Sequence, residues 1–496
     1  MAITGVTASN LTPSPVMKTL ASNYLDFTTA ADGWAKQYLP DVLAAEAESY
    51  GNRTMAGFLR QVGAEEAMSS DQVIWSEQGR LHLSYKGRVS HDDDQASGSG
   101  NGGQIVIEQD IDGRVVETTH GIRQNDILLI ADSNTTAVVI VTNDPQTTPT
   151  DTLSVAVYDN NPETLAGLGF ADGAADDTTG LTILVIGNEY AKGTTGRTGQ
   201  NEPSHLTYTN KPIIMKDKYA VSGSDTAQIG WVEVSAEDGT GGYLWYIKAE
   251  AETRMRFMDY LEMSMLETVK GGADADNSVV EFLGTGINNG HQGLFNAIET
   301  RGNQTSGVTG VNAATDLAEF DAILAEFDKN GAIEENMMFV NRATALAIDD
   351  MLASMNSYGS GGTSYGVFDN SEDMALNLGF SGFRRGSYDF YKSDWKYLNQ
   401  LDGRGGINAT NTVGAIRGII VPAGVSSVYD QMMGRNMKRP FLHVRFRASQ
   451  TDNRYLKTWV TGSVGAVTSD LDAMEVHYLS ERCLVTQGAN NFMLMN

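Results

Sequence analysis

Residues 243–272 limit what this chain can fold into, because they form the longest uninterrupted helical pattern in the sequence. Leu, Met, Glu, Arg and Ala dominate the stretch, it lacks proline, and Gly271 and Gly272 predict a left-handed stop. About 26 helical residues form a rod of roughly 39 Å, which is long for a helix of an ordinary domain. A core helix of a large domain is the other interpretation. The predicted apolar face comprises Ile247, Ala251, Met258, Leu261 and Met265.

Length and charge narrow the class of protein. A chain of 496 residues exceeds what one hydrophobic core holds, so we expect about two to four structural units. Asp and Glu number 62 against 35 Lys and Arg, which gives a net charge of −27. Such a surface repels phosphates and anionic membranes, and this argues against a protein that grips DNA. The charge suits a container that holds DNA without binding it, and equally suits a role in solubility alone.

Cys483 is the only cysteine, so the sequence offers neither an internal disulfide nor a cysteine-based metal cluster. This fits folding in a reducing compartment. The first twenty residues lack the basic and apolar pattern of a secretion signal, and no apolar run approaches the roughly 20 residues that span a membrane. We therefore expect a protein with no membrane partner and no targeting segment.

The first 90 residues divide into a polar part and a strand-rich part. Residues 1–70 are polar and only modestly helical, which predicts an extended N-terminal arm. Residues 72–89 alternate as strands do and predict a hairpin that turns near Gly79. Three basic residues gather in this hairpin and could dock on an acidic neighbour, although a solvated strand face is the commoner explanation for such residues. They are Arg80, Lys86 and Arg88.

Two glycine-rich segments, residues 91–103 and 193–199, bound a region of short β-rich runs. Turns rich in Asn, Asp, Gly and Pro separate these runs, a pattern typical of a small antiparallel barrel or sandwich. We interpret the region as an inserted all-β domain. The surrounding hairpin is then expected to leave near Val89 and return near Pro212. The predicted strands are residues 104–108, 127–131, 137–142, 153–158 and 181–186.

A helix, strand and helix form the clearest globular core of the sequence. Asp316 and Glu319 form a capping pair that predicts a helix over 316–329, which Asn330 and Gly331 end. Residues 337–340 predict a short buried strand, and Asn341 is predicted to cap a second helix that runs to about Ala353. Further strands are expected at 388–391, 415–421, 441–446, 456–460 and 473–485.

Candidate chemical motifs are weak throughout the chain. Residues 362–366 match a nucleophile elbow around Ser364, but no apolar strand precedes them. Residues 97–103 lack the Lys of a phosphate loop. The sequence therefore predicts no catalytic, cofactor-binding or metal-binding residue, and a protein that is not an enzyme.

Oxygen-rich and nitrogen-rich clusters give no better signal. The run from His91 to Asp94 and the pair Asp274 and Asp276 resemble cation ligands, but Val279 and Thr285 stand where a calcium loop has its glycine and closing glutamate. The histidines are scattered without the i, i+4 spacing of a zinc site. They are His82, His91, His120, His205, His291, His443 and His477.

The order of these parts resembles the major capsid proteins of tailed bacteriophages, which share the Hong Kong 97 fold. Three stretches in the centre of the chain carry the resemblance, and a fourth, SERCLVTQGANNFMLM, lies near its end. The arm and the inserted region carry none of it. The central stretches are TNKPIIMKDKYAVSGSD (209–225), GYLWYIKAEAETRMRFMDYLEM (242–263) and FDAILAEFDKNGAIEENMMFVNRATALAIDDML (320–352).

The resemblance implies an α+β Hong Kong 97-like fold in which the long helix is the spine. It assigns residues 1–70 to an N-terminal arm, 71–92 to the first part of an extended loop and 93–200 to the inserted β domain. It assigns 201–300 to the loop's return and the spine helix in a peripheral domain, 301–466 mostly to an axial domain, and 467–496 to C-terminal strands of the peripheral domain.

The resemblance also implies function and partners. The chain is expected to assemble with itself as hexamers and pentamers into an icosahedral shell that encloses double-stranded DNA without binding it tightly. A separate scaffolding protein, a portal and decoration proteins are the expected partners, in a virion capsid assembled in the bacterial cytoplasm. An encapsulin-like host compartment and a hydrolase or glycan-binding surface protein are the alternatives.

Overall fold

The computed structural model divides the chain into two compact units by its contacts. The larger comprises Met1–Trp75 and Tyr208–Asn496, and we call Ser76–Thr207 the barrel unit. Helices and strands mix, with more strand than helix, which confirms the predicted α+β class. Most of the predicted arm lies outside the described residues. These are 57–59, 64–91, 102–113, 115–116, 120–143, 152–159, 164–171, 180–197, 205–228, 234–235, 241–242, 244–271, 282, 290–331, 333–356, 382–410, 414–423, 425–430, 435–464 and 467–496.

A five-stranded sheet in the larger unit is built around the long strand β22 (Ala473–Thr486). Strand β10 (Ile213–Ser222) pairs antiparallel along one edge of β22. Strands β20 (Leu442–Arg447) and β21 (Lys457–Gly462) pair antiparallel with β22 as well, and β1 (Ala64–Met68) joins β20 in parallel. Because β22 pairs with three strands, it is the central element of this sheet.

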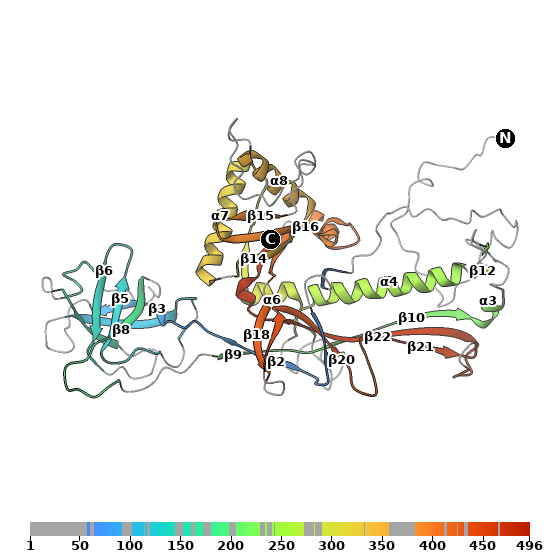
Figure 1. The fold of residues 1–496 in the computed structure, drawn as a ribbon, viewed down its shortest axis with the longest axis horizontal. Coiled ribbons are helices and arrows are strands. Elements are labelled where there is room, and N and C mark those ends of the chain that lie inside the picture. Colours follow the sequence, from blue (N-terminus) through green and yellow to red (C-terminus); the bar gives the residue numbers. More distant parts are fainter. Residues whose placement is uncertain are drawn as a thin grey trace. The chain divides into compact units, whose positions relative to one another are not determined.

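Helix α4 (Leu244–Glu267) lies along the five-stranded sheet, beside β10 and β22 (Figure 1). Its 24 residues span about 36 Å. Phe257 and Leu261 are buried against Val476 and Tyr478 of β22, and Met258 packs at the margin of this cluster. The predicted long helix is therefore present, and Met258, Leu261 and Met265 of its predicted apolar face pack into the core, whereas the side chain of Ile247 lies outside the described residues.

Two details of the predicted long helix are wrong. The helix ends at Glu267, four residues before Gly271, and Gly272 lies outside the described residues. After the last turn, the Thr268 carbonyl accepts a hydrogen bond from Gly293 N–H at 2.7 Å, so the chain turns away before the glycines. Ala251 is exposed, and Phe257 supplies the buried position that the prediction omitted.

A six-stranded sheet with helices α7 (Ala313–Asn330) and α8 (Arg342–Asn356) forms the other layered part of the larger unit (Figure 1). Phe320 of α7 meets Phe383 and Phe390 at ring-centroid distances of 5.4 and 5.1 Å. The strands of this six-stranded sheet are, in order, β13 (Asn303–Thr305), β23 (Met493–Met495), β17 (Gly418–Pro422), β14 (Glu335–Val340), β16 (Tyr388–Asp394) and β15 (Gly382–Arg385).

The ends of α7 correct one prediction and confirm another. Asn312 is the N-cap, and its Oδ1 accepts from the N–H groups of Ala314 and Thr315 at 3.1 and 2.9 Å. The predicted start at Asp316 is wrong by one turn, because the carboxylates of Asp316 and Glu319 accept instead from the preceding loop. The end at Gly331 is confirmed by its left-handed φ of 60°.

The next two predictions in this region hold. The strand expected at 337–340 lies within β14. Asn341 caps α8, since its Oδ1 accepts from Thr344 N–H at 2.8 Å. The C-terminal strands, however, are shared between the two sheets: β22 belongs to the five-stranded sheet, whereas β23 pairs with β13 and β17 in the six-stranded sheet. Strands β20 and β21 likewise pair with β22, and the predicted assignment of 301–466 mostly to an axial domain stays a prediction.

The barrel unit contains a closed six-stranded barrel in the order β3-β4-β7-β6-β5-β8. Each of the five predicted runs in this region coincides with a strand, and the preceding β3 supplies the sixth. Inward-facing apolar residues of all six strands fill one core. The strands are β3 (Ser84–His91), β4 (Gly103–Asp110), β5 (Asp126–Ala131), β6 (Thr136–Val141), β7 (Thr152–Val157) and β8 (Leu181–Asn188).

The predicted hairpin turn near Gly79 is wrong. Strand β2 (Val73–Gln78) pairs with β9 (His205–Asn210), whereas β3 pairs with β4 and β8. The two strands part because β3 buries Tyr85 and Val89 in the barrel core. The other described elements are α3 (Gly223–Gln228), β11 (Val234–Ser235), β12 (Gly241–Gly242), α6 (Leu294–Arg301), α10 (Lys396–Asn399), α11 (Arg404–Thr410), β18 (Val425–Asp430), β19 (Arg435–Pro440) and η3 (Ala489–Asn491).

The barrel gives a test at one glycine. A Cβ added to Gly87 would lie 2.0 Å from the Val106 carbonyl oxygen, whereas one added to Gly187 meets open space. We expect Gly87→Ala to lower the free energy of unfolding by about 1–3 kcal/mol, because backbone atoms must move. Gly187→Ala is the matched control. Calorimetry of the full chain measures both, and equal melting temperatures would contradict the close approach of β3 and β4.

Candidate functional site

The weak motifs of the sequence contribute no described site. Ser364, Asp274, Asp276 and the run from Asp92 to Asp94 lie outside the described residues. Within the described ranges, no group of three or more His, Cys, Asp or Glu side chains is placed to hold a metal ion. The histidines are spread over both units. Burial raises the pKa of Cys483 to about 12, so its thiol stays protonated at neutral pH.

Two of the three basic residues of the first strands are paired inside the barrel unit. Arg80 binds Asp112 with an Nη2 to Oδ1 distance of 2.7 Å. Arg88 binds Glu108 at 2.9 Å. The hypothesis that these charges dock on an acidic neighbour therefore loses its main support, because local carboxylates neutralise them.

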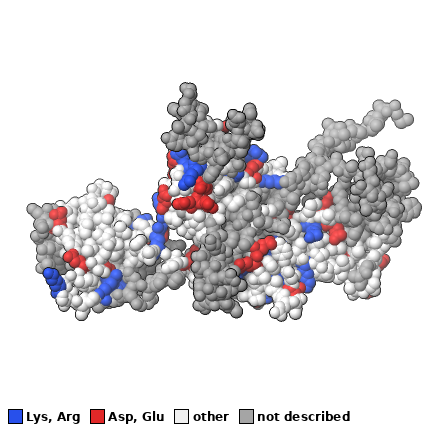
Figure 2. Space-filling view, in the orientation of Figure 1, with Lys and Arg blue, Asp and Glu red and all other residues white. Residues whose placement is uncertain are grey.

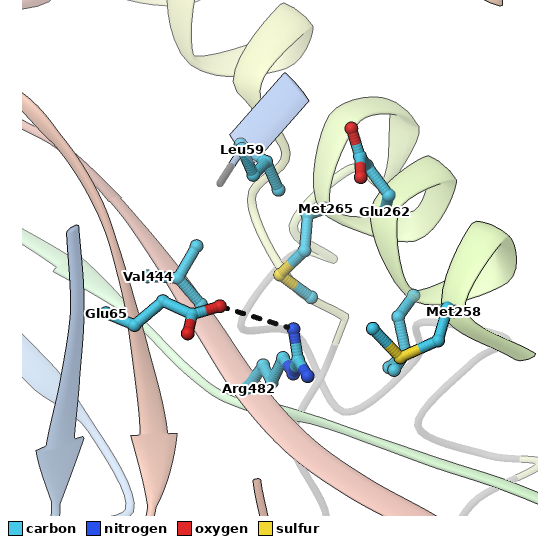
Figure 3. Close-up of a pocket in the computed structure, with 8 residues that line it drawn as sticks. Leu59, Glu65, Met258, Glu262, Met265, Val444 and Arg482 are labelled. Atoms are coloured by element: carbon cyan, nitrogen blue, oxygen red, sulfur yellow. Dashed lines mark ion pairs between the residues drawn. The ribbon is translucent and has the colours of Figure 1, made fainter. Parts of the chain in front are cut away.

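A cavity of about 60 Å³ lies between α4 and the five-stranded sheet (Figure 3). It is large enough for a few water molecules and too small for an organic substrate. Apolar side chains form most of its wall, and three charged residues border it. The lining residues are Leu59, Glu65, Met258, Leu261, Glu262, Met265, Val444 and Arg482.

Glu262 fixes the residues that precede β1 to the long helix. Its carboxylate accepts hydrogen bonds from the N–H groups of Gly57 at 2.6 Å and Phe58 at 2.7 Å. Burial raises the pKa of Glu262 above its ordinary value, and the N–H groups of Gly57, Phe58 and Leu59 act against this shift. The Phe58 ring stacks on Trp395 at 4.4 Å, so this short segment is held by both polar and apolar contacts.

Arg482 of β22 occupies the other side of the cavity. Figure 3 shows its guanidinium facing Glu65, with an Nη1 to Oε1 distance of 3.8 Å. The guanidinium also lies 4.2 Å from the centre of the Tyr455 ring and donates to Ser480 Oγ at 3.0 Å. Tyr455 OH in turn donates to Glu65 at 3.0 Å. The charges of Glu65 and Arg482 therefore face each other. The arrangement holds together β1, β22 and the loop between β20 and β21 that carries Tyr455.

A second polar cluster joins three distant segments of the larger unit. The Asn210 side chain accepts from Gln292 N–H at 2.9 Å and donates to the carbonyls of Gln292 and Leu484 at 3.0 and 2.7 Å. Leu484 N–H donates to His291 Nε2 at 3.4 Å, so the proton resides on Nδ1, which contacts the Lys211 carbonyl at 3.0 Å. Burial lowers the pKa of His291 to about 4. A neutral imidazole is thus part of the fold.

Aromatic side chains lie beside this cluster where the chain passes between the two units. The rings of Trp75 and Tyr208 lie 6.2 Å apart. The Arg301 guanidinium lies 4.3 Å from the Tyr208 ring centre and 5.6 Å from that of Trp75, which stabilises both rings. Lys270 donates to the Thr209 carbonyl at 3.0 Å. These contacts hold Trp75 of β2 and Tyr208 of β9 beside each other.

Sequence reasoning missed Glu262, Asn210 and His291. Glu262 had a usable signal, because it lies one position from Leu261 and three from Met265 on a helix whose buried face is apolar. Asn210 and His291 gave no local signal. Apart from the Lys211 N–H, which donates to Asn210 Oδ1 at 2.9 Å, the partners of Asn210 lie 82 or more positions away in the sequence, and those of His291 lie 80 or more positions away.

Comparison with known proteins gives matches among solved structures only. No protein-family model and no curated protein matches the sequence. A structure from Microbacterium phage Oxtober96 has 10% identity and a TM-score of 0.36, covering 95% of this chain and 99% of that one. The capsid structure of the cyanophage P-SCSP1u has 7% identity and a TM-score of 0.38, covering 93% of each chain. The mature capsid of bacteriophage PhiM1 has 7% identity and a TM-score of 0.29, covering 62% and 78%.

These matches come from bacteriophages, the group that the sequence resemblance names. Their TM-scores lie below 0.4, so the functional argument rests on the residues of this chain. No described helix combines the length and the apolar character that crossing a membrane requires.

The raised pKa of Glu262 sets the direction of one pH effect. The folded state holds the carboxyl proton of Glu262 more tightly than the unfolded chain does. Protonated Glu262 therefore adds to the free energy of unfolding below the ordinary pKa of 4.5, and this contribution is lost as pH rises through the folded pKa. We expect Glu262→Gln to remove this decrease in the free energy of unfolding with rising pH. Urea unfolding between pH 4 and 7 measures it, with exposed Glu299→Gln as control; parallel curves for wild type and Glu262→Gln would contradict the argument.

His291 has the opposite sign. Its folded pKa of about 4 lies below the ordinary 6.5, so its contribution is present above 6.5 and is lost as pH falls toward 4. The free energy of unfolding then changes by at most about 1.4 kcal/mol per pH unit. We expect His291→Gln to flatten this part of the unfolding curve, whereas His82→Gln, at an exposed position, leaves it unchanged. An unaltered slope in His291→Gln would show that another group controls it.

Proposed function

We propose that this chain is the major capsid subunit of a tailed bacteriophage with a Hong Kong 97-like fold. One observation carries the proposal: α4 buries one side against the sheet and leaves large side chains exposed elsewhere. Phe257 and Leu261 are buried, whereas Met255 and Tyr260 are exposed. A long helix that exposes Met and Tyr suits a subunit that packs against copies of itself.

The parts of the proposed subunit follow the described elements. The spine is α4, and the five-stranded sheet beneath it forms the peripheral domain with β1, β10, β20, β21 and β22. The six-stranded sheet with α7 and α8 forms the axial domain. Strands β2 and β9 with the barrel unit take the place of the extended loop and its insertion. Residues 1–70 are the proposed N-terminal arm, and within its described part Glu262 binds the N–H groups of Gly57 and Phe58.

The proposed shell is icosahedral, built from hexamers and pentamers, and encloses double-stranded DNA. A net charge of −27 supports enclosure without tight binding, because phosphates are repelled from such a surface. A scaffolding protein, a portal and decoration proteins are the proposed partners, and assembly is placed in the bacterial cytoplasm. The small cavity beneath α4 supports a structural role, since Glu65 and Arg482 at its border face each other and Glu262 binds backbone N–H groups.

Assembly is the direct test. We expect the purified full chain to sediment as hexamers, pentamers or larger particles, and electron microscopy to show closed shells when a scaffold is co-expressed. Met255→Gln with Tyr260→Gln is expected to reduce assembly at least tenfold without lowering the melting temperature, because both side chains are exposed in the single chain. Val311→Gln, exposed near α7, is the control. A monomer at every concentration, with scaffold present, would overturn the proposal.

A further inference from the structure

We propose that the outer face of barrel strands β7, β6, β5 and β8 is a docking surface for a basic protein that presents an apolar contact face. Antiparallel strands with one solvated face alternate apolar and polar residues. Here β5 (DILLIA) and β6 (TAVVIV) are apolar at nearly every position, so both faces of these strands are apolar.

The register places the outward apolar residues side by side. Leu128, Ile130 and Val139 point inward and are fully buried in the barrel core. The alternate positions therefore point outward. Leu129 of β5 pairs with Leu184 of β8 and with Val138 of β6.

The same row continues onto the next strand. Tyr158 N–H donates to the Val138 carbonyl at 3.3 Å, so Tyr158 lies beside Val138 at the end of β7. A second row follows, in which Ile127 pairs with Ile140 and Ile140 with Ala156. We call these two rows, with Ile186 beside them, the apolar face of the barrel.

Several members of this face are exposed to solvent. Val138, Leu184, Tyr158 and Ile186 expose 37%, 38%, 44% and 52% of their surface. Contiguous exposed apolar residues on a folded unit mark a contact surface, because their burial is favourable. The barrel core is complete without them. They therefore have no structural task within the barrel itself.

Tyr158 is already positioned for contact. Its hydroxyl donates to Glu189 Oε2 at 2.5 Å, which fixes the ring at the edge of the apolar face. An aromatic side chain held before binding loses little conformational freedom when a partner docks. Tyr is also among the residues that contribute most to protein interfaces.

Charge selects the kind of partner. The barrel unit carries 19 Asp and Glu against 7 Lys and Arg, a formal charge of −12. Asp132, Asp159 and Glu189 directly follow strands or residues of the apolar face. Such a unit repels its own copies, nucleic acid and anionic membranes, and attracts a basic protein. Figure 2 shows an area of this unit without charged side chains.

The test uses the full-length protein and two labelled synthetic helical peptides with the same apolar face, one with a lysine-rich and one with a glutamate-rich polar face. The surface variant is Val138→Thr with Leu184→Thr. The matched control is Ile74→Thr with Leu206→Thr, since these residues are exposed and apolar but lie on β2 and β9. Fluorescence anisotropy measures binding, and melting temperatures check that every variant folds.

We expect the lysine-rich peptide to bind wild type and the control alike, and to bind the surface variant at least tenfold more weakly. We expect binding to weaken with salt and the glutamate-rich peptide to bind at least tenfold more weakly. Equal binding to the surface variant, equal binding of both peptides, or no binding of either overturns the proposal. So does sedimentation showing self-association that the surface variant loses, which would make a second copy the occupant. The outcome does not depend on whether the chain forms shells.

Discussion

The packing of α4 on β22 is the contact on which the rest of the larger unit depends. Phe257 and Leu261 meet Val476 and Tyr478 near one end of β22, and further along the strand Leu484 enters the core that Met265 and Leu266 share. After β22 the chain passes through η3 into β23, which lies in the other sheet. One continuous C-terminal segment therefore connects both sheets, and a shift of α4 would be felt in each.

Three buried polar side chains of this unit bind backbone. Asn210 binds three main-chain groups on two distant segments, Glu262 binds the N–H groups of Gly57 and Phe58, and His291 contacts main-chain atoms of Lys211 and Leu484. Buried polar side chains in such arrangements specify where loops lie. Catalysis instead needs polar groups that converge on a space where a substrate fits. Here the three side chains instead hold together segments that are distant in sequence.

Elements with strong local patterns could be predicted from the sequence. Five of the six barrel strands could be predicted from runs of β-branched and apolar residues, and the long helix could be predicted from helical spacing. The glycine end of α7 followed from Gly331. The start of α7 was misplaced because Asp316 and Glu319 imitate a capping pair, while Asn312 performs that role and Glu319 binds Thr309 instead.

Strand pairing and the polar clusters could not be predicted, because both depend on residues distant in sequence. Strand β2 was expected to turn back on β3, yet its partner β9 begins more than 120 residues later. Nothing near Gly79 signals this choice. The apolar character of β5 and β6 on both faces was visible in the sequence, but which face remained exposed was decided by closure of the barrel.

The adjacency of Trp75 and Tyr208, whose rings lie 6.2 Å apart, has an evolutionary consequence. The chain departs and comes back at a single point, so the 132 residues between them form a cassette. Such a cassette can be lost, lengthened or exchanged for another folded module by recombination, while the framework that carries it keeps its own geometry.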